Sequence, residues 1–515
     1  MPKRMKAQDM PIVVKSTRSP SSFALAIHII EEQFGPLAAS VAKAMSGGEK
    51  MTLKHISDVL KMEYPKSEVS NEDTIKHILA SFLQHGILFK TSVSVLEKEG
   101  STLFTLDVDA ILFRLRYSKM CDFLQHVKYK HDKDKGIAAA EIFTILWRKG
   151  RINQSELLAK AETSLKGTTI RSTIYSVFTE LQKNQYIQNA PKLIEIGDVT
   201  ETEDGDDEER SSKRQRVDMK VPLRVNTERF LKSFRIQAYR DTCKDLINIH
   251  PNIKDKDEAH KVLSDFFDAV ESEGGDVAKS VRVESFVSKQ NDNKTKKALS
   301  DLSVASQINL PTILIHKSEG KQVFYRLSWK NVLKRMRRNI IEDIVKARFG
   351  AKHFRIFCLL LDSTYLEEKQ ISHAVLLDPK ETRQALYDLF RGGFLKMQEV
   401  PKKSDYNPQT TLYLWNVPID QVVKTNRERT HEIILNLRIT RALVYENNWD
   451  LIDRVQRNNL DDEEKRAKEK YEKVKKKLTA LLVAVQRLDN TLIALSNTRS
   501  ESKSFLRSSQ LRYDA

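Results

Sequence analysis

The chain has 515 residues, 40% of them hydrophobic and 30% charged, and a formal net charge of +17 at pH 7, which predicts roughly three to five packed domains with solvated surfaces. No run approaches the ~20 apolar residues of a membrane helix, the polar start lacks the apolar core of a secretory signal, and three dispersed cysteines exclude a disulfide framework and metal spacing. An intracellular protein is expected. Its positive charge favours an anionic partner such as nucleic acid, and is equally common in subunits of large basic assemblies.

The first module combines helical apolar spacing with two helix starts. Thr52 and Asn71 can cap a second and a third helix, because their side chains accept amide hydrogens of the first turn. Two strands are expected to follow, over residues 87–95 and 102–107. Three helices and a β-hairpin make a winged helix, which buries one small core and leaves its third helix and wing exposed.

A second module repeats this order, with helices over residues 138–149, 155–161 and 168–183 and a short wing that starts at Tyr186. An amphipathic segment, residues 110–130, precedes it. We interpret that segment as a connector helix between the two modules.

A strongly charged segment follows the second module. Acidic side chains dominate residues 198–209, and a basic run comes directly after them. Low hydrophobicity and like-charge repulsion predict disorder here. The basic residues Lys213, Arg214 and Arg216 fit a nuclear-import signal, with a solvated linker as the alternative interpretation.

The third module opens with a helix that carries Phe230 and Phe234 and closes with a hairpin, residues 312–316 and 322–327. Between them, helices are expected near residues 260–270 and 295–301. Gly274 and Gly275 would separate these helices.

The fourth module shows the pattern of a winged helix most clearly. One continuous helix is expected over residues 340–361, followed by helices at 370–377 and 379–390. A hairpin over residues 394–400 and 411–417 completes the module.

The tail shows a heptad pattern in place of strand signals. Its predicted seam residues are Val474, Leu478, Leu481, Val485, Leu488, Leu492 and Leu495. A matching apolar series lies upstream, and the polar residues 458–462 can turn the chain between the two series. An antiparallel helical hairpin is therefore predicted, with a homodimer as the alternative, and its outer face could dock on a larger partner.

Together these elements predict an α+β, mostly helical fold, with tandem winged-helix domains followed by a C-terminal antiparallel coiled-coil hairpin. The expected divisions are a flexible N-terminal extension (1–20), winged helix 1 (21–109), a connector helix (110–136), winged helix 2 (137–195), a disordered acidic and basic linker (196–222), winged helix 3 (223–329), winged helix 4 with a basic lead-in helix (330–418), the helical hairpin (419–498) and a flexible tail (499–515).

Base reading requires basic or amide side chains near the start of a third helix. The first and fourth modules place the acidic Glu72, Asp73 and Glu381 there, which would repel phosphates and favour protein binding instead. Nonspecific contact with the DNA backbone is more compatible with the basic faces, which could equally be solvated surfaces. The candidates for such contacts are Lys166, Arg171, Lys330, Lys334, Arg337, Arg338, Lys402 and Lys403.

The sequence contains no phosphate-binding glycine loop, nucleophile elbow or metal-binding helix motif. We therefore predict no catalytic residues, no cofactor and no metal. A chain of small modules with exposed helices and wings indicates a binding scaffold and not an enzyme.

Short motifs in the same order along nearly the whole chain resemble one family. They are Gln33-Phe34-Gly35, Leu115-Arg116-Tyr117, Arg229-Phe230, Phe234-Arg235, Arg348-Phe349-Gly350, Arg355-Ile356-Phe357, Glu367-Glu368-Lys369-Gln370, Gln398-Glu399-Val400-Pro401-Lys402 and Leu412-Tyr413-Leu414. With the acidic segment and the helical tail, they resemble the tandem winged-helix subunit of eukaryotic RNA polymerase III, the largest member of its three-subunit initiation subcomplex.

This resemblance implies a nuclear, noncatalytic subunit with four winged helices and a coiled-coil tail, seated on the polymerase clamp beside two smaller initiation subunits. It also implies roles in opening promoter DNA, through mostly nonspecific contacts, and in holding initiation factors for short untranslated transcripts. Two alternatives make different predictions. A free-standing winged-helix DNA-binding regulator would prefer a specific site, and a scaffold of the proteasome-lid or signalosome type would carry a long helical repeat before its last wing.

Overall fold

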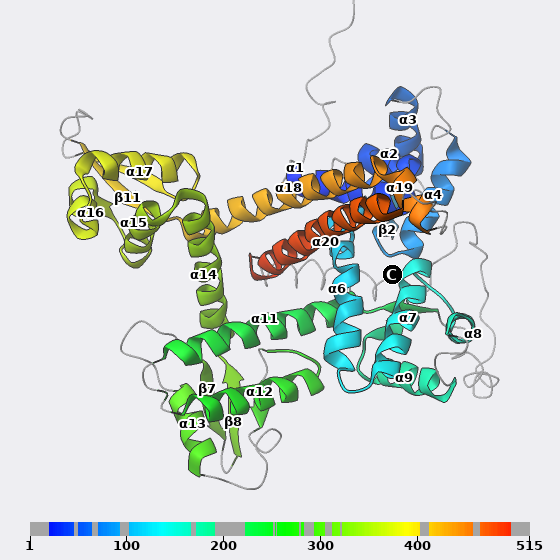
Figure 1. Cartoon of the computed structure of the whole chain (residues 1–515), viewed down its shortest axis with the longest axis horizontal. Coiled ribbons are helices and arrows are strands. Elements are labelled where there is room, and N and C mark those ends of the chain that lie inside the picture. Colours follow the sequence, from blue (N-terminus) through cyan, green and yellow to red (C-terminus); the bar gives the residue numbers. More distant parts are fainter. Residues whose placement is uncertain are drawn as a thin grey trace, which may run out of the picture. The chain divides into compact units, whose positions relative to one another are not determined.

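The computed structural model describes residues 20–45, 50–63, 71–92, 102–165, 171–190, 222–250, 253, 255–277, 280–282, 293–303, 312–319, 322–401, 411–456 and 464–495 (Figure 1). The chain divides into two compact units. Unit 1 combines Met1–Thr227 with His431–Gln486, and unit 2 combines Glu228–Thr430 with Arg487–Ala515. The expected N-terminal extension and the flexible tail after residue 498 lie outside the described residues.

The modules repeat the order helix, short first strand or bridge, one or two further helices, and two antiparallel strands. The first module in unit 1 contains α2 (Pro36–Ala44), β1 (Met51–Thr52), α3 (Leu53–Glu63), α4 (Glu72–Gln84), β2 (Leu88–Ser92) and β3 (Thr102–Leu106), preceded by α1 (Pro20–Phe34). The second contains α7 (Lys133–Lys149), α8 (Gln154–Ser164), α9 (Arg171–Lys183), β4 (Ile187–Asn189) and β5 (Leu223–Val225).

Unit 2 holds the other two modules. The third contains α12 (Lys256–Ser272), β6 (Val281–Arg282), α13 (Asn293–Ser303), β7 (Leu314–Glu319) and β8 (Gln322–Leu327), preceded by α11 (Thr227–Ile249). The fourth contains α15 (Ala351–Asp362), β9 (Leu366–Glu367), α16 (Glu368–Val375), α17 (Pro379–Arg391), β10 (Lys396–Pro401) and β11 (Thr411–Asn416), preceded by α14 (Trp329–Phe349). The predicted α+β, mostly helical fold with winged-helix domains is confirmed.

The small sheets share one topology. The last strand of each hairpin lies between the hairpin's first strand and the short first strand of the module, as the orders β1-β3-β2, β6-β8-β7 and β10-β11-β9 show. In the second module a single bridge from Ile152 to Leu223 takes the place of the first strand. All of these pairs are antiparallel.

Local signals explain where the helices begin. The Asn71 side chain accepts the Asp73 N–H at 3.2 Å, and the Asp378 side chain accepts the Lys380 N–H at 3.1 Å ahead of Pro379. These contacts satisfy amide groups that a helix start leaves without partners. The sequence therefore placed α4 and α17 correctly.

Two segments that the sequence predicted as continuous helices are each divided into shorter elements. The single helix expected over residues 340–361 is wrong, because α14 ends and α15 begins at Gly350, whose φ of 86° favours glycine. The connector over residues 110–130 is divided into α5 (Val108–Phe113), a 3₁₀ turn (Arg114–Arg116), α6 (Tyr117–Asp122) and a π-helix (Phe123–Lys128).

The strand that follows the acidic and basic segment belongs to the second module. Strand β5 pairs with β4, and Leu223, which is 2% exposed, also bridges Ile152. Residues 223–225 therefore complete the second wing, where the sequence had placed the start of the third module. The segment between β4 and β5 therefore connects two strands of one sheet. It includes Lys213, Arg214 and Arg216, which lie outside the described residues.

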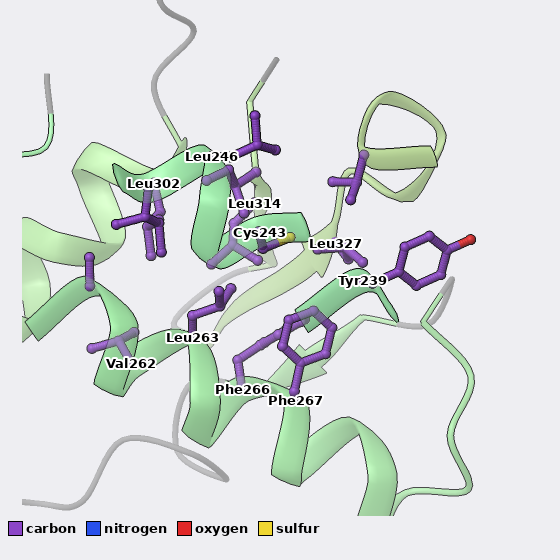
Figure 2. Close-up of a cluster of buried hydrophobic side chains, with 14 of the residues drawn as sticks. Tyr239, Cys243, Leu246, Val262, Leu263, Phe266, Phe267, Leu302, Leu314 and Leu327 are labelled. Atoms are coloured by element: carbon purple, nitrogen blue, oxygen red, sulfur yellow. The ribbon is translucent and has the colours of Figure 1, made fainter. Parts of the chain in front are cut away.

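Unit 2 contains two apolar cores that share α14. The core of the third module collects aromatic and aliphatic side chains from α11, α12, α13, β7 and β8, as Figure 2 shows for Tyr239, Phe266, Phe267, Leu302 and Leu314. Val332, Leu333 and Met336 in the first half of α14 join this core. Ile341 and Val345 in the second half join the core of the fourth module. Helix α14 therefore fixes the two modules to each other.

Unit 1 is organised around a buried arginine, in a cluster that we call the Arg114 junction (Phe34, His85, Arg114 and Trp147). Arg114 is 7% exposed, its Nε donates to Gln33 Oε1, and its guanidinium carbon lies 5.2 Å from the Phe34 ring centroid and 4.7 Å from that of Trp147. Burial lowers the pKa of Arg114 to about 10. Burial, and then the nearby Arg114 charge, lower the pKa of His85 to about 4.

The tail forms α18 (Ile419–Glu446), α19 (Trp449–Gln456) and α20 (Glu464–Leu495). α18 begins in unit 2 and ends in unit 1, whereas α20 begins in unit 1 and ends in unit 2. Leu495, at the end of α20, is buried in the same core as Val422 near the start of α18. The chain therefore returns in the opposite direction, as expected of an antiparallel hairpin.

Candidate nucleic-acid and partner-binding surfaces

The basic face of α14 divides into exposed and engaged residues. Lys330 and Lys334 are exposed to solvent. Arg337 is half-buried, and burial lowers its pKa in spite of the nearby Tyr239 and Asp420. The guanidinium of Arg338 forms ion pairs with carboxylates of the fourth module. The two lysines are thus the members of this face that remain available for a phosphate backbone.

Arg338 ties α14 to α15. Its Nη1 lies 2.5 Å from Asp362 Oδ1, its Nη2 lies 3.1 Å from Asp362 Oδ2, and its Nε lies 2.5 Å from Glu342 Oε1. Such paired, charge-assisted bonds hold both groups in their charged forms. They raise the pKa of Arg338 and lower the pKa of Asp362, chiefly through their mutual hydrogen bonds.

The remaining predicted DNA contacts are dispersed. Arg171 Nε lies 2.8 Å from Glu162 Oε1, in the second module. Lys166, Lys402 and Lys403 lie outside the described residues.

The third helices differ more than the sequence suggested. On α17, Glu381 is 2.8 Å from Lys352 Nζ, so its charge is compensated within the module. The exposed residues of α17 that recur every three or four positions are Lys380, Arg383, Gln384, Tyr387 and Arg391. The sequence places Lys380, Arg383 and Gln384 beside Glu381 at the start of this helix, and the weight given to Glu381 left out their continuation to Tyr387 and Arg391.

A lysine-rich third helix was also missed. Lys294, Lys296 and Lys297 of α13 are exposed. The basic run is visible in the sequence, but α13 was expected only as an uncertain helix near residues 295–301. The third module therefore adds positive charge that the candidate set did not include.

The predicted seam of the tail lies on α20. Val485, Leu492 and Leu495 are buried, and Val474, Leu478, Leu481 and Leu488 are half-buried. Polar contacts hold the tail within unit 1, because Gln486 Nε2 donates to Ser118 Oγ at 3.3 Å and Arg438 pairs with Glu32 of α1. Arg438 and the neighbouring His28 lower the pKa of Glu32 against the effect of its burial.

Among the described residues, no group of three His, Cys, Asp or Glu side chains could hold a metal ion. None of the described helices is long and apolar enough to span a membrane.

Comparison with known protein families identifies the fourth module. Residues 341–417 match the family described as POLR3C, C-terminal winged-helix domain. The matched region comprises the second half of α14, the three following helices and the wing. It contains both Arg338's partner Asp362 and the exposed face of α17.

Proteins that are similar in sequence to parts of this chain are named as polymerase subunits. The chain is 26% identical over 195 residues to DNA-directed RNA polymerase III subunit rpc3 of Dictyostelium discoideum, covering 37% of this chain and 29% of that protein. It is 32% identical over 117 residues to subunit RPC3 of Homo sapiens, covering 23% of this chain and 22% of that protein. With subunit rpc3 of Aspergillus niger the identity is 26% over 180 residues, 34% of this chain and 28% of that protein. The matches thus span less than a third of each relative.

Proposed function

We propose that this chain is a non-catalytic subunit of DNA-directed RNA polymerase III that acts in transcription initiation for short untranslated RNAs. The match of residues 341–417 to the POLR3C domain carries this proposal. The relatives named as RPC3 subunits support it. So does the architecture, because winged-helix modules occupy the region before the last wing where a proteasome-lid or signalosome scaffold would place a helical repeat.

The proposed partners are the polymerase core, at its clamp, two smaller initiation subunits and initiation factors, all in the nucleus. Affinity isolation of the tagged full chain from nuclear extract, followed by quantitative mass spectrometry, tests this proposal. Polymerase III subunits should be recovered in fixed proportion to the chain. Recovery of the chain without any polymerase subunit would refute it.

We further propose that Lys330 and Lys334 contact promoter DNA nonspecifically. Both are exposed on one face of α14, whereas Arg338 is engaged with Asp362. Replacing both lysines with Gln should lower the slope of log affinity against log salt by about 2 on random-sequence duplex, since each phosphate contact releases about one counterion. Arg338→Gln is the control for lost positive charge on the same helix, because Arg338 is already paired with Asp362 and its replacement should leave the slope unchanged. Equal slopes for the lysine variant and the wild type would remove α14 from the DNA interface.

A further inference from the structure

The turn between α16 and α17 holds a leucine in an unfavourable backbone conformation. Leu376 has φ 55° and ψ 49°, in the left-handed region. Its side chain is nevertheless 87% exposed. Glycine or asparagine normally occupies this position at the end of a helix, because a β-carbon is strained there. Leu376 therefore contributes neither to the core nor to a relaxed turn, which points to a role outside the fold.

The surrounding residues impose this conformation from inside the domain. Arg355 Nη2 donates to the Val375 carbonyl at 2.6 Å, and Ser372 Oγ donates to the Leu377 carbonyl at 2.8 Å. The Leu377 N–H also donates to the Ser372 carbonyl at 3.3 Å. The peptide groups on both sides of Leu376 are thus fixed, and its side chain is held out in solvent.

Leu376 lies in the turn just before α17, and we group it with exposed residues of that helix as the α17 face (Leu376, Lys380, Arg383, Tyr387, Phe390 and Arg391). Tyr387 is 46% exposed and Phe390 is 41% exposed. Their ring centroids lie 5.6 Å and 6.0 Å from that of Trp415, which they meet edge-on and which is 2% exposed. The two exposed rings are therefore supported on a rigid base.

The charges on the α17 face select its partner. Arg383 pairs with Glu368 at 2.8 Å, but none of the described residues forms a salt bridge with Lys380 or Arg391. The acidic residues of the helix have partners inside the domain, since Glu381 pairs with Lys352 and Asp388 Oδ2 lies 3.3 Å from His353 Nε2. The surface thus combines uncompensated positive charge with exposed apolar groups.

We propose that the α17 face docks on an acidic protein surface of the polymerase, with an apolar pocket that receives Leu376. Aromatic and arginine side chains are the residues enriched at the centres of protein interfaces. A phosphate backbone offers no pocket for a leucine, which favours a protein over a nucleic acid. This inference rests on the proposed function, which supplies the polymerase as the partner.

The test uses the full chain and RNA polymerase III purified without its own copy of this subunit, with binding measured by biolayer interferometry. Leu376→Gly should lower affinity about thirtyfold, the scale of one interface hot spot, while the melting temperature stays equal or rises because the turn is relieved of strain. Lys380→Glu combined with Arg391→Glu should lower affinity further, and more at 50 mM than at 200 mM salt. Met62→Ala, at an equally exposed apolar residue of α3 (86% exposed), is the matched control and should bind as wild type does.

The outcomes separate the two proposals. Wild-type affinity for Leu376→Gly, at unchanged stability, would overturn the docking surface and leave the proposed function in place. Weakened binding to random-sequence DNA, single-stranded or duplex, with unchanged binding to the polymerase would overturn it in favour of a nucleic-acid surface. A wild-type chain that does not bind the polymerase would overturn the proposed function together with this inference.

Discussion

Replacing Trp147 with Leu should destabilise unit 1 mainly through its effect on Arg114. The indole ring lies 4.7 Å from the guanidinium carbon, and the Phe34 ring lies 5.2 Å from it. No carboxylate of the described residues forms a salt bridge with this buried cation. The two rings and the Gln33 amide therefore supply the attraction that offsets its desolvation.

The pKa of Arg114 gives the scale of the effect. Burial lowers it from 12.5 to about 10, which corresponds to ~3 kcal/mol against the charged form. A cation facing a desolvated tryptophan gains about 1–2 kcal/mol. Trp147→Leu should therefore cost about 2–3 kcal/mol, of which ~1 kcal/mol is lost packing that does not depend on the charge. In an Arg114→Met background only the packing part should remain.

The double-mutant cycle of these two substitutions isolates the interaction, with an expected coupling of about 1–2 kcal/mol. Because a chain of several domains does not unfold in one step, the measurement should report on unit 1 alone. Hydrogen exchange of α7 amides as a function of urea meets this requirement. A coupling below about 0.5 kcal/mol would refute the reasoning, since Trp147 would then support Arg114 no better than any apolar side chain.

Other consequences concern unit 1. Burial lowers the pKa of His85 from 6.5 to about 4, so the unfolded chain binds a proton at a higher pH than the folded chain does. Urea unfolding of the wild type should therefore show the stability of unit 1 decreasing as the pH is lowered from 6.5 to 4. His85→Gln should flatten this pH dependence. Gly150→Ala should destabilise by about 2 kcal/mol or more, because φ is 72° and a β-carbon would lie 2.7 Å from the Gln84 carbonyl oxygen. The control Gly86→Ala, with φ 67° and no atom within 4 Å of the added β-carbon, should cost only the backbone strain, ~1 kcal/mol. Equal losses of melting temperature for the two variants would contradict the clash at Gly150. Deleting residues 196–216 should leave the melting temperature unchanged, whereas Leu223→Asp should lower it by several degrees. A larger loss of melting temperature for the deletion than for Leu223→Asp would show that β5 does not close the second wing.

Elements with local signals could be predicted from the sequence. The starts of α4 and α17 follow from Asn71 and Asp378, whose side chains cap them. The hairpin of the fourth module follows from alternating residues on either side of a polar turn. Each of these signals acts within a few residues, and therefore needs no knowledge of the rest of the fold.

Pairings across long stretches of sequence could not be predicted. Strand β5 joins β4 only after residues 191–221, and nothing near Leu223 indicates its partner. The ion pairs of the charged residues could not be predicted either, because Arg338 pairs with Asp362 of the next helix and Glu381 pairs with Lys352 of another helix. Charge alone therefore identified the basic face of α14 but not which of its members are already engaged.

Several motifs that resemble the polymerase family have structural roles here. Gly350 separates two helices, Arg355 fixes the Val375 carbonyl, and the Gln370 side chain accepts the Glu367 N–H at 3.0 Å. These residues stabilise the backbone of the winged helix, and they do not indicate which side chains its surface presents to a partner. A family resemblance carried by such positions predicts the fold more directly than it predicts the partners.

The surfaces presented by the third helices differ although their scaffold is repeated. On α4, Lys76 is paired with Glu72 at 3.1 Å and Gln84 donates to the Lys149 carbonyl at 2.8 Å, so part of this face is used inside unit 1. On α9 the exposed residues are mainly hydroxyl-bearing, and on α17 they are basic and aromatic. One DNA-reading role repeated in every module would require similar basic faces. The differences instead fit a scaffold in which each module meets a different neighbour.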